Sequence, residues 1–154
     1  MYDGQLYEAI RRYVLRFLPD SDSANDVTQE VFLRLKENQN KIEQPRAWAY
    51  RTARNLVIDR FRQIKMSELP DNILAEATKF NPVLLTEKKE VIEMIQEKIN
   101  ELSARHREVL RLKFQEGLKY AEIAEIINEP VTTVAWLIHE AVALLKKELG
   151  ANSL

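Results

Sequence analysis

Apolar residues recur every three or four positions along almost the whole chain, and the strict alternation that marks half-buried strands is rare. Prolines, which lack the backbone donor that a helix interior needs, interrupt this pattern at Pro19, Pro45, Pro70, Pro82 and Pro130. We therefore predict an all-α protein. The expected helices cover residues 4–18, about 21–38, 46–65, about 87–101, 103–117, 120–127 and about 132–149.

The stretch 66–86 has weak periodicity and contains two of the five prolines, as interdomain linkers do. We therefore divide the chain into two small helical domains, residues 1–65 and 87–154, joined by a flexible linker over 66–86. Side chains within 21–23 and at Ser103 offer N-terminal caps to two of the helices. Asn128 can adopt the left-handed conformation that a turn between two helices requires.

Composition narrows the classes of function. With 45% hydrophobic and 31% charged residues, the chain suits a globular protein. Cysteine is absent and glycine occurs three times, which excludes disulfides, thiolate sites and a glycine-rich phosphate loop. His106 and His139 lack the spacing of metal ligands, so we expect no metal and no other cofactor. No apolar run is long enough to span a membrane and residues 1–4 do not resemble a signal peptide, so we expect a cytoplasmic protein without membrane insertion.

Positive charge is concentrated in one segment, although the whole chain carries a net charge of −1. Residues 1–65 contain 12 Lys or Arg against 9 Asp or Glu, whereas 66–86 and 87–154 each carry a net charge of −2. Six cations and one anion, Asp59, lie between residues 46 and 65. A local patch of this kind can bind phosphate even in a slightly acidic protein.

A helical wheel of residues 46–65 separates two faces. The apolar face, which we expect in the core, holds Ala49, Ala53, Leu56, Val57, Phe61 and Ile64. The other face carries Arg51, Arg54, Arg62 and Lys65 within about 80° of one another, with Asn55 at its edge. A solvated basic surface would explain this face, but cations for phosphates beside an amide for a base edge also suit a nucleic-acid site. Trp48 and Tyr50 fit either the core or the support of an unstacked base.

Two stretches of the N-terminal half resemble region 2 of the sigma-70 family. They are DVTQEVFLRL at residues 26–35 and PRAWAYRTARNLVID at residues 45–59. The resemblance is closest to the extracytoplasmic-function (ECF) group, which retains only regions 2 and 4. It covers about residues 5–65 and implies a domain of three to four helices.

The resemblance also implies contacts for particular residues. Asp26, Gln29, Glu30 and Leu33 share one helix face and match positions that dock on the clamp helices of the largest subunit of core RNA polymerase. The loop 38–44 matches the part that holds a flipped base of the non-template strand, and the helix behind it matches the part that melts the −10 promoter element. The implied DNA-binding residues are Asn38, Gln39, Asn40, Lys41, Arg46, Trp48, Arg51, Arg54, Asn55, Arg62 and Lys65.

Residues 103–149 resemble region 4, the helix-turn-helix that binds the −35 element, through SARHREVLRL at 103–112 and EGLKYAEIA at 116–124. The second helix of this unit departs from the family pattern, which is rich in basic residues. No Lys or Arg occurs from 131 to 145. Because affinity for DNA scales with the number of cations placed on phosphates, we expect this helix to bind DNA poorly.

The same helix carries apolar residues where relatives expose polar groups. Two explanations stay open, namely a locally repacked core with Trp136 turned inward, or a protein-docking surface whose partner selects the promoter. The candidate surface comprises Ala135, Trp136, His139, Val142 and Ala143. Candidate partners are an anti-sigma factor, a second copy of the chain, the polymerase flap and a separate DNA-targeting protein.

The sequence therefore predicts an alternative sigma factor that binds core RNA polymerase and melts the −10 element, with region 4 specialised for a protein partner. The alternative is a helix-turn-helix adaptor that contacts polymerase without sigma activity. No set of nucleophile, base and oxyanion donors is visible, so we expect no enzymatic activity.

Overall fold

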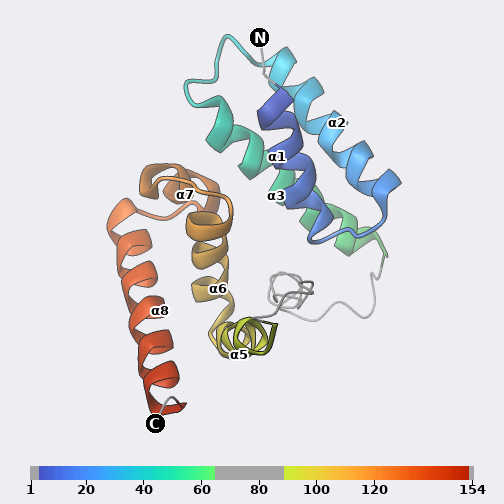
Figure 1. The fold of residues 1–154 in the computed structure, drawn as a ribbon. Coiled ribbons are helices and arrows are strands. Elements are labelled where there is room, and N and C mark those ends of the chain that lie inside the picture. The colour runs from blue at the N-terminus through green and yellow to red at the C-terminus, as the bar shows by residue number, and fades with distance from the viewer. Residues whose placement is uncertain (1–3, 65–88, 153–154) are drawn as a thin grey trace.

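The computed structural model describes residues 4–64 and 89–152, and all regular elements in these ranges are helices (Figure 1). The N-terminal group comprises α1 (Gly4–Leu15), α2 (Ser21–Glu37) and α3 (Pro45–Ile64). The C-terminal group comprises α5 (Lys89–Asn100), α6 (Ala104–Leu110), the π-helical turn η1 (Arg111–Gln115), α7 (Tyr120–Ile127) and α8 (Val131–Asn152). The all-α prediction is confirmed. The predicted linker, 66–86, lies outside the described residues.

The three N-terminal helices pack against one another around a core supplied by all of them. The apolar face predicted for α3 is confirmed at Ala49, Ala53 and Val57, which are fully buried. Leu56 and Phe61 are partly buried against the same core. The small alanine side chains let the neighbouring helices approach α3 closely, so this helix becomes the centre of the group.

Two helix ends in this group differ from the prediction. Helix α1 stops at Leu15 instead of residue 18, because the next residues tighten into a turn in which the Phe17 amide donates to the Val14 carbonyl at 3.0 Å. The cap of α2 is Asp20 and not a side chain within 21–23. Its carboxylate accepts hydrogen bonds from the amide and the hydroxyl of Ser23, at 3.2 and 2.9 Å. A carboxylate at this position satisfies an amide that the helix leaves without a partner.

The C-terminal group contains one interruption that the sequence analysis missed. The predicted helix 103–117 begins as α6, with the Ser103 cap as expected, and then widens into the π-helical turn η1. There the Glu116 amide donates to the carbonyl of Arg111 at 3.0 Å. Gly117 follows with a φ of +70° and ends the turn. Asn128, between α7 and α8, has a φ of 57°, which confirms the predicted left-handed turn.

The two groups share one hydrophobic core. Helix α3 lies against α7 (Figure 1), and a single cluster of buried side chains runs from Val14 and Val57 in the first group to Leu118 and Ile123 in the second. The guanidinium of Arg111 lies 5.5 Å from the centre of the Phe17 ring, across the same boundary. The described helices therefore pack together, and the C-terminal group covers one side of α3.

Candidate functional site

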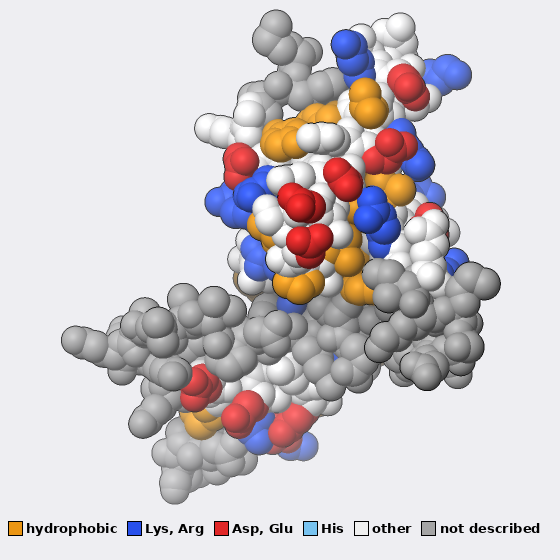
Figure 2. All heavy atoms as spheres, turned by 90° about the vertical axis from the view of Figure 1, so that its right-hand side faces the viewer, with side chains coloured by type: hydrophobic (Ala, Val, Ile, Leu, Met, Phe, Trp, Pro, Cys, Tyr) orange, Lys and Arg blue, Asp and Glu red, His pale blue; other side chains and the backbone are white. Residues whose placement is uncertain are grey.

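The outer face of α2 presents the first set of predicted site residues. Asp26, Gln29 and Leu33 are exposed, and Leu33 keeps 57% of its surface in contact with solvent. Glu30 is partly exposed, and its carboxylate lies 2.9 Å from the guanidinium of Arg34. Figure 2 shows acidic, basic and hydrophobic side chains mixed over this side of the molecule. An exposed leucine on a helix face that also carries charged and polar side chains is suited to contact with another protein.

The loop between α2 and α3 borders a small polar pocket. Its volume is about 230 Å³, and its lining residues are Lys41, Ile42, Glu43, Gln44, Trp48 and Glu125. Five of these come from the loop or from the start of α3, and Glu125 comes from α7. Gln39 and Asn40 are exposed on the same loop, while the Asn38 amide group donates to the Arg34 carbonyl at 2.8 Å.

The two aromatics that the sequence left undecided have different environments. Tyr50 is 2% exposed, and its ring centre lies 5.1 Å from that of Tyr13, so it belongs to the core. Trp48 is partly exposed and borders the polar pocket. Of the two, only Trp48 is accessible to a base.

The predicted cationic face of α3 divides into two parts. Arg51, Asn55 and Arg62 are exposed to solvent. Arg54, with 20% of its side chain exposed, and Arg46, with 46% exposed, form ion pairs with the C-terminal group. Lys65 lies outside the described residues. Arg46 and Arg54 are eight positions apart, with Tyr50 midway, and residues spaced by four lie on one side of a helix. This side of α3 is the one that meets α6 and α7.

Each member of this 46–50–54 row has a partner in the C-terminal group. Arg46 donates to the Gly117 carbonyl at 2.7 Å and lies 3.2 Å from a carboxylate oxygen of Glu122. The Tyr50 hydroxyl donates to Glu116 at 3.0 Å. Arg54 donates to both carboxylate oxygens of Glu108, with 3.3 Å between Nη2 and Oε2. Burial alone would lower the pKa of Arg54, but the hydrogen bonds and charge of Glu108 outweigh it and raise that pKa.

Glu116 is the most deeply buried of these acids, with 4% of its side chain exposed. Its second carboxylate oxygen lies 3.3 Å from Nε of Arg16, but without the alignment of a hydrogen bond. Burial raises the pKa of Glu116, and the charge of Arg16 and the hydrogen bond from Tyr50 oppose that rise. Burial, with the nearby charge of Arg16, lowers the pKa of Arg111 to about 10. This charged cluster was not predicted from the sequence, because no local pattern pairs α3 with α6 and α7.

Helix α8 presents the residues predicted to bind a protein partner. Trp136 is 61% exposed, so the explanation with Trp136 turned into the core is wrong. His139 and Ala143 are exposed on the same face, and Ala135 is partly buried at its edge. Val142 does not belong to this surface, because it packs against the hydrophobic core. It lies six positions after Trp136, which places it on another side of the helix.

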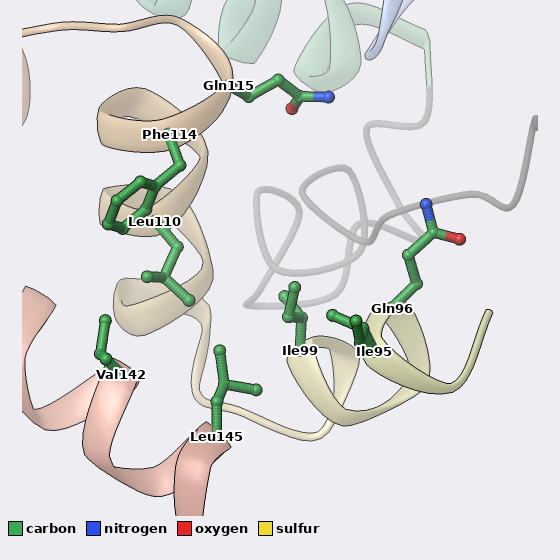
Figure 3. A pocket seen from close by; sticks show the side chains of 8 residues that line it. All are labelled: Ile95, Gln96, Ile99, Leu110, Phe114, Gln115, Val142 and Leu145. Carbon is green, nitrogen blue, oxygen red and sulfur yellow. The ribbon is translucent and has the colours of Figure 1, made fainter. Parts of the chain in front are cut away.

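An apolar groove of about 480 Å³ lies between α5, α6 with η1, and α8 (Figure 3). Its lining residues are Ile95, Gln96, Ile99, Leu110, Phe114, Gln115, Val142 and Leu145. Phe114 is 66% exposed. This groove was not predicted from the sequence, because it forms only where three helical segments meet.

None of the helices in 4–64 and 89–152 combines the length and apolar character that crossing a membrane requires. Within the same ranges no cluster of three or more His, Asp or Glu side chains is arranged to hold a metal ion.

Comparisons with known proteins cover both helical groups. Residues 4–66 match the family Sigma-70 region 2, and residues 92–145 match Sigma-70, region 4. The chain is 33% identical to the ECF RNA polymerase sigma factor SigW of Bacillus subtilis, over 97% of this chain and 85% of that protein. It is 30% identical to the ECF RNA polymerase sigma factor SigL of Mycobacterium tuberculosis, over 92% and 84%.

A solved structure has the same fold. It is the sigma factor RpoE of Bartonella quintana, crystallised in complex with the anti-sigma factor NepR. The TM-score is 0.61 at 18% sequence identity, and the match covers 95% of this chain and 92% of that one.

Proposed function

The chain belongs to the sigma-70 family, in its ECF group, and is therefore a non-enzymatic transcription initiation factor; from this premise we propose that it binds core RNA polymerase through α2 and melts the −10 promoter element through α3 and the loop before it. Regions 2 and 4 of the family correspond to the N-terminal and C-terminal groups. The observation that carries the proposal is the cationic face of α3 beside the loop 38–44 and its polar pocket.

Polymerase docking is assigned to Asp26, Gln29, Glu30 and Leu33. Their accessibility on α2 supports this assignment, since the opposite side of that helix, with Val27 and Val31, is buried in the core. The expected partner is the pair of clamp helices of the largest polymerase subunit. An exposed leucine among acids would contribute buried apolar area at the centre of the contact, and the acids would set its orientation.

Strand separation is assigned to the loop 38–44 and to α3. Opening a duplex costs on the order of 1.4 kcal/mol per base step of stacking, and a captured base returns about 1–3 kcal/mol. Trp48 and the polar pocket would hold a base that has left the stack, with Asn55 close to its edge. Arg51 and Arg62 would contact the phosphates of the same strand.

Region 4 is assigned to a protein partner through the surface of Trp136, His139 and Ala143. Two observations support this assignment: the indole of Trp136 is exposed, and residues 131–145 contain no Lys or Arg. Candidate partners are an anti-sigma factor, as in the complex of the Bartonella relative, the polymerase flap, or a separate DNA-targeting protein. On this proposal, α8 contributes little affinity for the −35 element.

Transcription in vitro with purified core polymerase tests the −10 assignment. We expect promoter-dependent starts with the wild-type chain. A variant with Arg51→Ala, Asn55→Ala and Arg62→Ala should form a holoenzyme but lose promoter opening, and the salt dependence of single-strand binding should weaken by about 1.4 in log–log slope for the two lost cations. A control variant, Lys36→Ala with Lys119→Ala, removes two exposed cations elsewhere. Promoter opening by the triple variant at the level of this control would refute the assignment, and absence of promoter-dependent starts would favour the adaptor.

Binding of the full chain to a duplex that carries a −35 region tests the assignment of α8. We expect weak binding that Trp136→Ala leaves unchanged, while the same substitution weakens binding to purified polymerase or to an anti-sigma factor. Tight, salt-sensitive duplex binding that depends on α8 and needs no protein partner would contradict it.

A further inference from the structure

The polar pocket beside the loop 38–44 is lined by charged and amide side chains that are available to a ligand. Lys41, Glu43 and Gln44 come from one segment of the loop, and Glu125 comes from α7. Within residues 4–64 and 89–152, none of these four side chains takes part in a hydrogen bond or an ion pair. The donors and acceptors around the pocket are therefore not used by the described part of the fold.

Acceptors predominate among these four side chains. An ionised carboxylate can only accept hydrogen bonds, so Glu43 and Glu125 contribute acceptors alone. Gln44 offers one acceptor oxygen and one donor group, and the ammonium of Lys41 can only donate. The pocket is therefore suited to a ligand that presents N–H donors at its edge, together with an oxygen that can accept from Lys41.

The bases of DNA differ in the donors that they present. Adenine, cytosine and guanine each carry an exocyclic amine, whereas thymine has the carbonyl oxygen O4 at the position where cytosine has its amine. A carboxylate accepts a hydrogen bond from the cytosine amine. The single N–H donor of thymine lies between two carbonyl oxygens, and both repel an approaching carboxylate. An acceptor-rich pocket therefore disfavours thymine.

We infer that the loop pocket selects a non-template base with an exocyclic amine over thymine, and that Glu43 is the residue that makes this distinction. The inference rests on the proposed function of the loop and α3. Glu43 is assigned rather than Glu125 because it lies on the same segment as Lys41 and Gln44, directly before the helix that carries Trp48.

The other groups proposed to hold the strand do not distinguish one base from another. Trp48 stacks on a ring face, which every base has, and Arg51 and Arg62 contact phosphates, which carry no sequence information. These residues supply affinity, whereas the carboxylate at the edge of the base supplies the choice. Because Glu43 is exposed to solvent, we expect the lower end of the discrimination that a contact with a base edge provides.

The test uses two fluorescein-labelled single-stranded dodecamers, one of 5-methylcytosine and one of thymine. The two bases share the ring, the methyl group and O2, and they differ in the amine or carbonyl at position 4 and in the accompanying change at N3. Because all bases of a strand are identical, the base that enters the pocket does not depend on the register of binding. Anisotropy measures the affinity of each strand for holoenzyme assembled from the full chain and purified core polymerase, with core polymerase alone as the blank.

We expect the wild-type holoenzyme to bind the 5-methylcytosine strand about tenfold more tightly than the thymine strand, which corresponds to about 1.4 kcal/mol. Glu43→Gln should reduce this ratio to within about twofold, mainly by improving the thymine strand, because an amide group can rotate to donate to O4. The matched control is Glu37→Gln, which removes the same charge from an exposed position at the end of α2, outside the pocket, and should keep the wild-type ratio. An effect of charge on the phosphates would change the affinity of both strands alike.

Two kinds of result would overturn the inference. Equal affinities of the wild type for the two strands, or no binding above the blank, would show that the loop does not read the base. A ratio that survives Glu43→Gln, or that disappears in Glu125→Gln alone, would take the distinction away from Glu43. In each case promoter-dependent starts by the wild-type holoenzyme would leave the proposed function standing, whereas absence of those starts, with neither strand bound, would end both.

Discussion

The hydrogen bond between Tyr50 and Glu116 lies in the interface between the two helical groups, where 4% of the Glu116 side chain is exposed. The hydroxyl lies 3.0 Å from one carboxylate oxygen, and the other oxygen is buried without a hydrogen bond among the described residues. Tyr50→Phe keeps the ring packing and removes the only hydrogen bond found for this carboxylate in the described part of the chain. Hydrogen bonds to charged groups contribute about 1.5–3 kcal/mol, so we expect a loss of about 2 kcal/mol in the free energy of unfolding.

Urea unfolding followed by circular dichroism measures this loss. With a urea dependence of about 2 kcal/mol per molar, the midpoint should fall by about 1 M. The matched control is Tyr7→Phe, whose ring packs 5.0 Å from that of Phe32, and we expect a change within about 0.5 kcal/mol. In a Glu116→Gln background the acceptor is neutral, so the cost of Tyr50→Phe should fall to about 1 kcal/mol.

The effect of Tyr50→Phe also depends on pH in a defined direction. Because burial raises the pKa of Glu116 above its ordinary value of 4.5, the protonated carboxyl favours the folded state, and this contribution is lost as the pH rises through the raised pKa. The hydroxyl stabilises the ionised form, so the loss in Tyr50→Phe should be largest at neutral pH and shrink in acid. A loss no larger than that of Tyr7→Phe at neutral pH would refute this account of the interface.

Three further predictions concern single positions. Leu137→Ala should lower the free energy of unfolding by about 2–5 kcal/mol because Leu137 is 3% exposed, whereas Trp136→Ala should change it by less than about 0.5 kcal/mol. Urea unfolding of both variants tests the orientation of α8. Asn128→Ala should cost about 1 kcal/mol because alanine disfavours a φ of 57°, and Asn128→Gly should be neutral or stabilising in thermal unfolding; equal effects of the two would contradict the left-handed turn. The hydrogen bonds from Ser23 lower the pKa of Asp20, so the Asp20 carboxylate should stabilise α2 above pH 3.8 and lose that effect as the pH falls further. A melting-temperature difference between wild type and Asp20→Asn that persists in strong acid would exclude this role of the carboxylate.

The spacing of apolar residues and prolines in the sequence determined the helices and the faces that they bury. Apolar spacing placed Ala49, Ala53 and Val57 in the core, and Pro19, Pro45 and Pro130 marked breaks between described helices. These features depend on residues three or four positions apart, whose side chains lie together in any α-helix. The accessible face of α2 followed from the same spacing, because its opposite side is apolar. The turn at Asn128 followed from the chemistry of one residue.

Only the tertiary structure decided which cations of α3 stay clear of the C-terminal group. The wheel placed Arg51 and Arg54 on one flank, but α6 and α7 cover only the side of α3 that carries Arg54. The partners of Arg54, Tyr50 and Arg46 lie 54, 66 and 71 positions away along the chain. Periodicity states which side of a helix avoids water, but it does not state which other helix will cover the remaining sides. That choice depends on long-range packing and on the π-helical turn that brings Glu116 to the boundary, and neither leaves a local signature in the sequence.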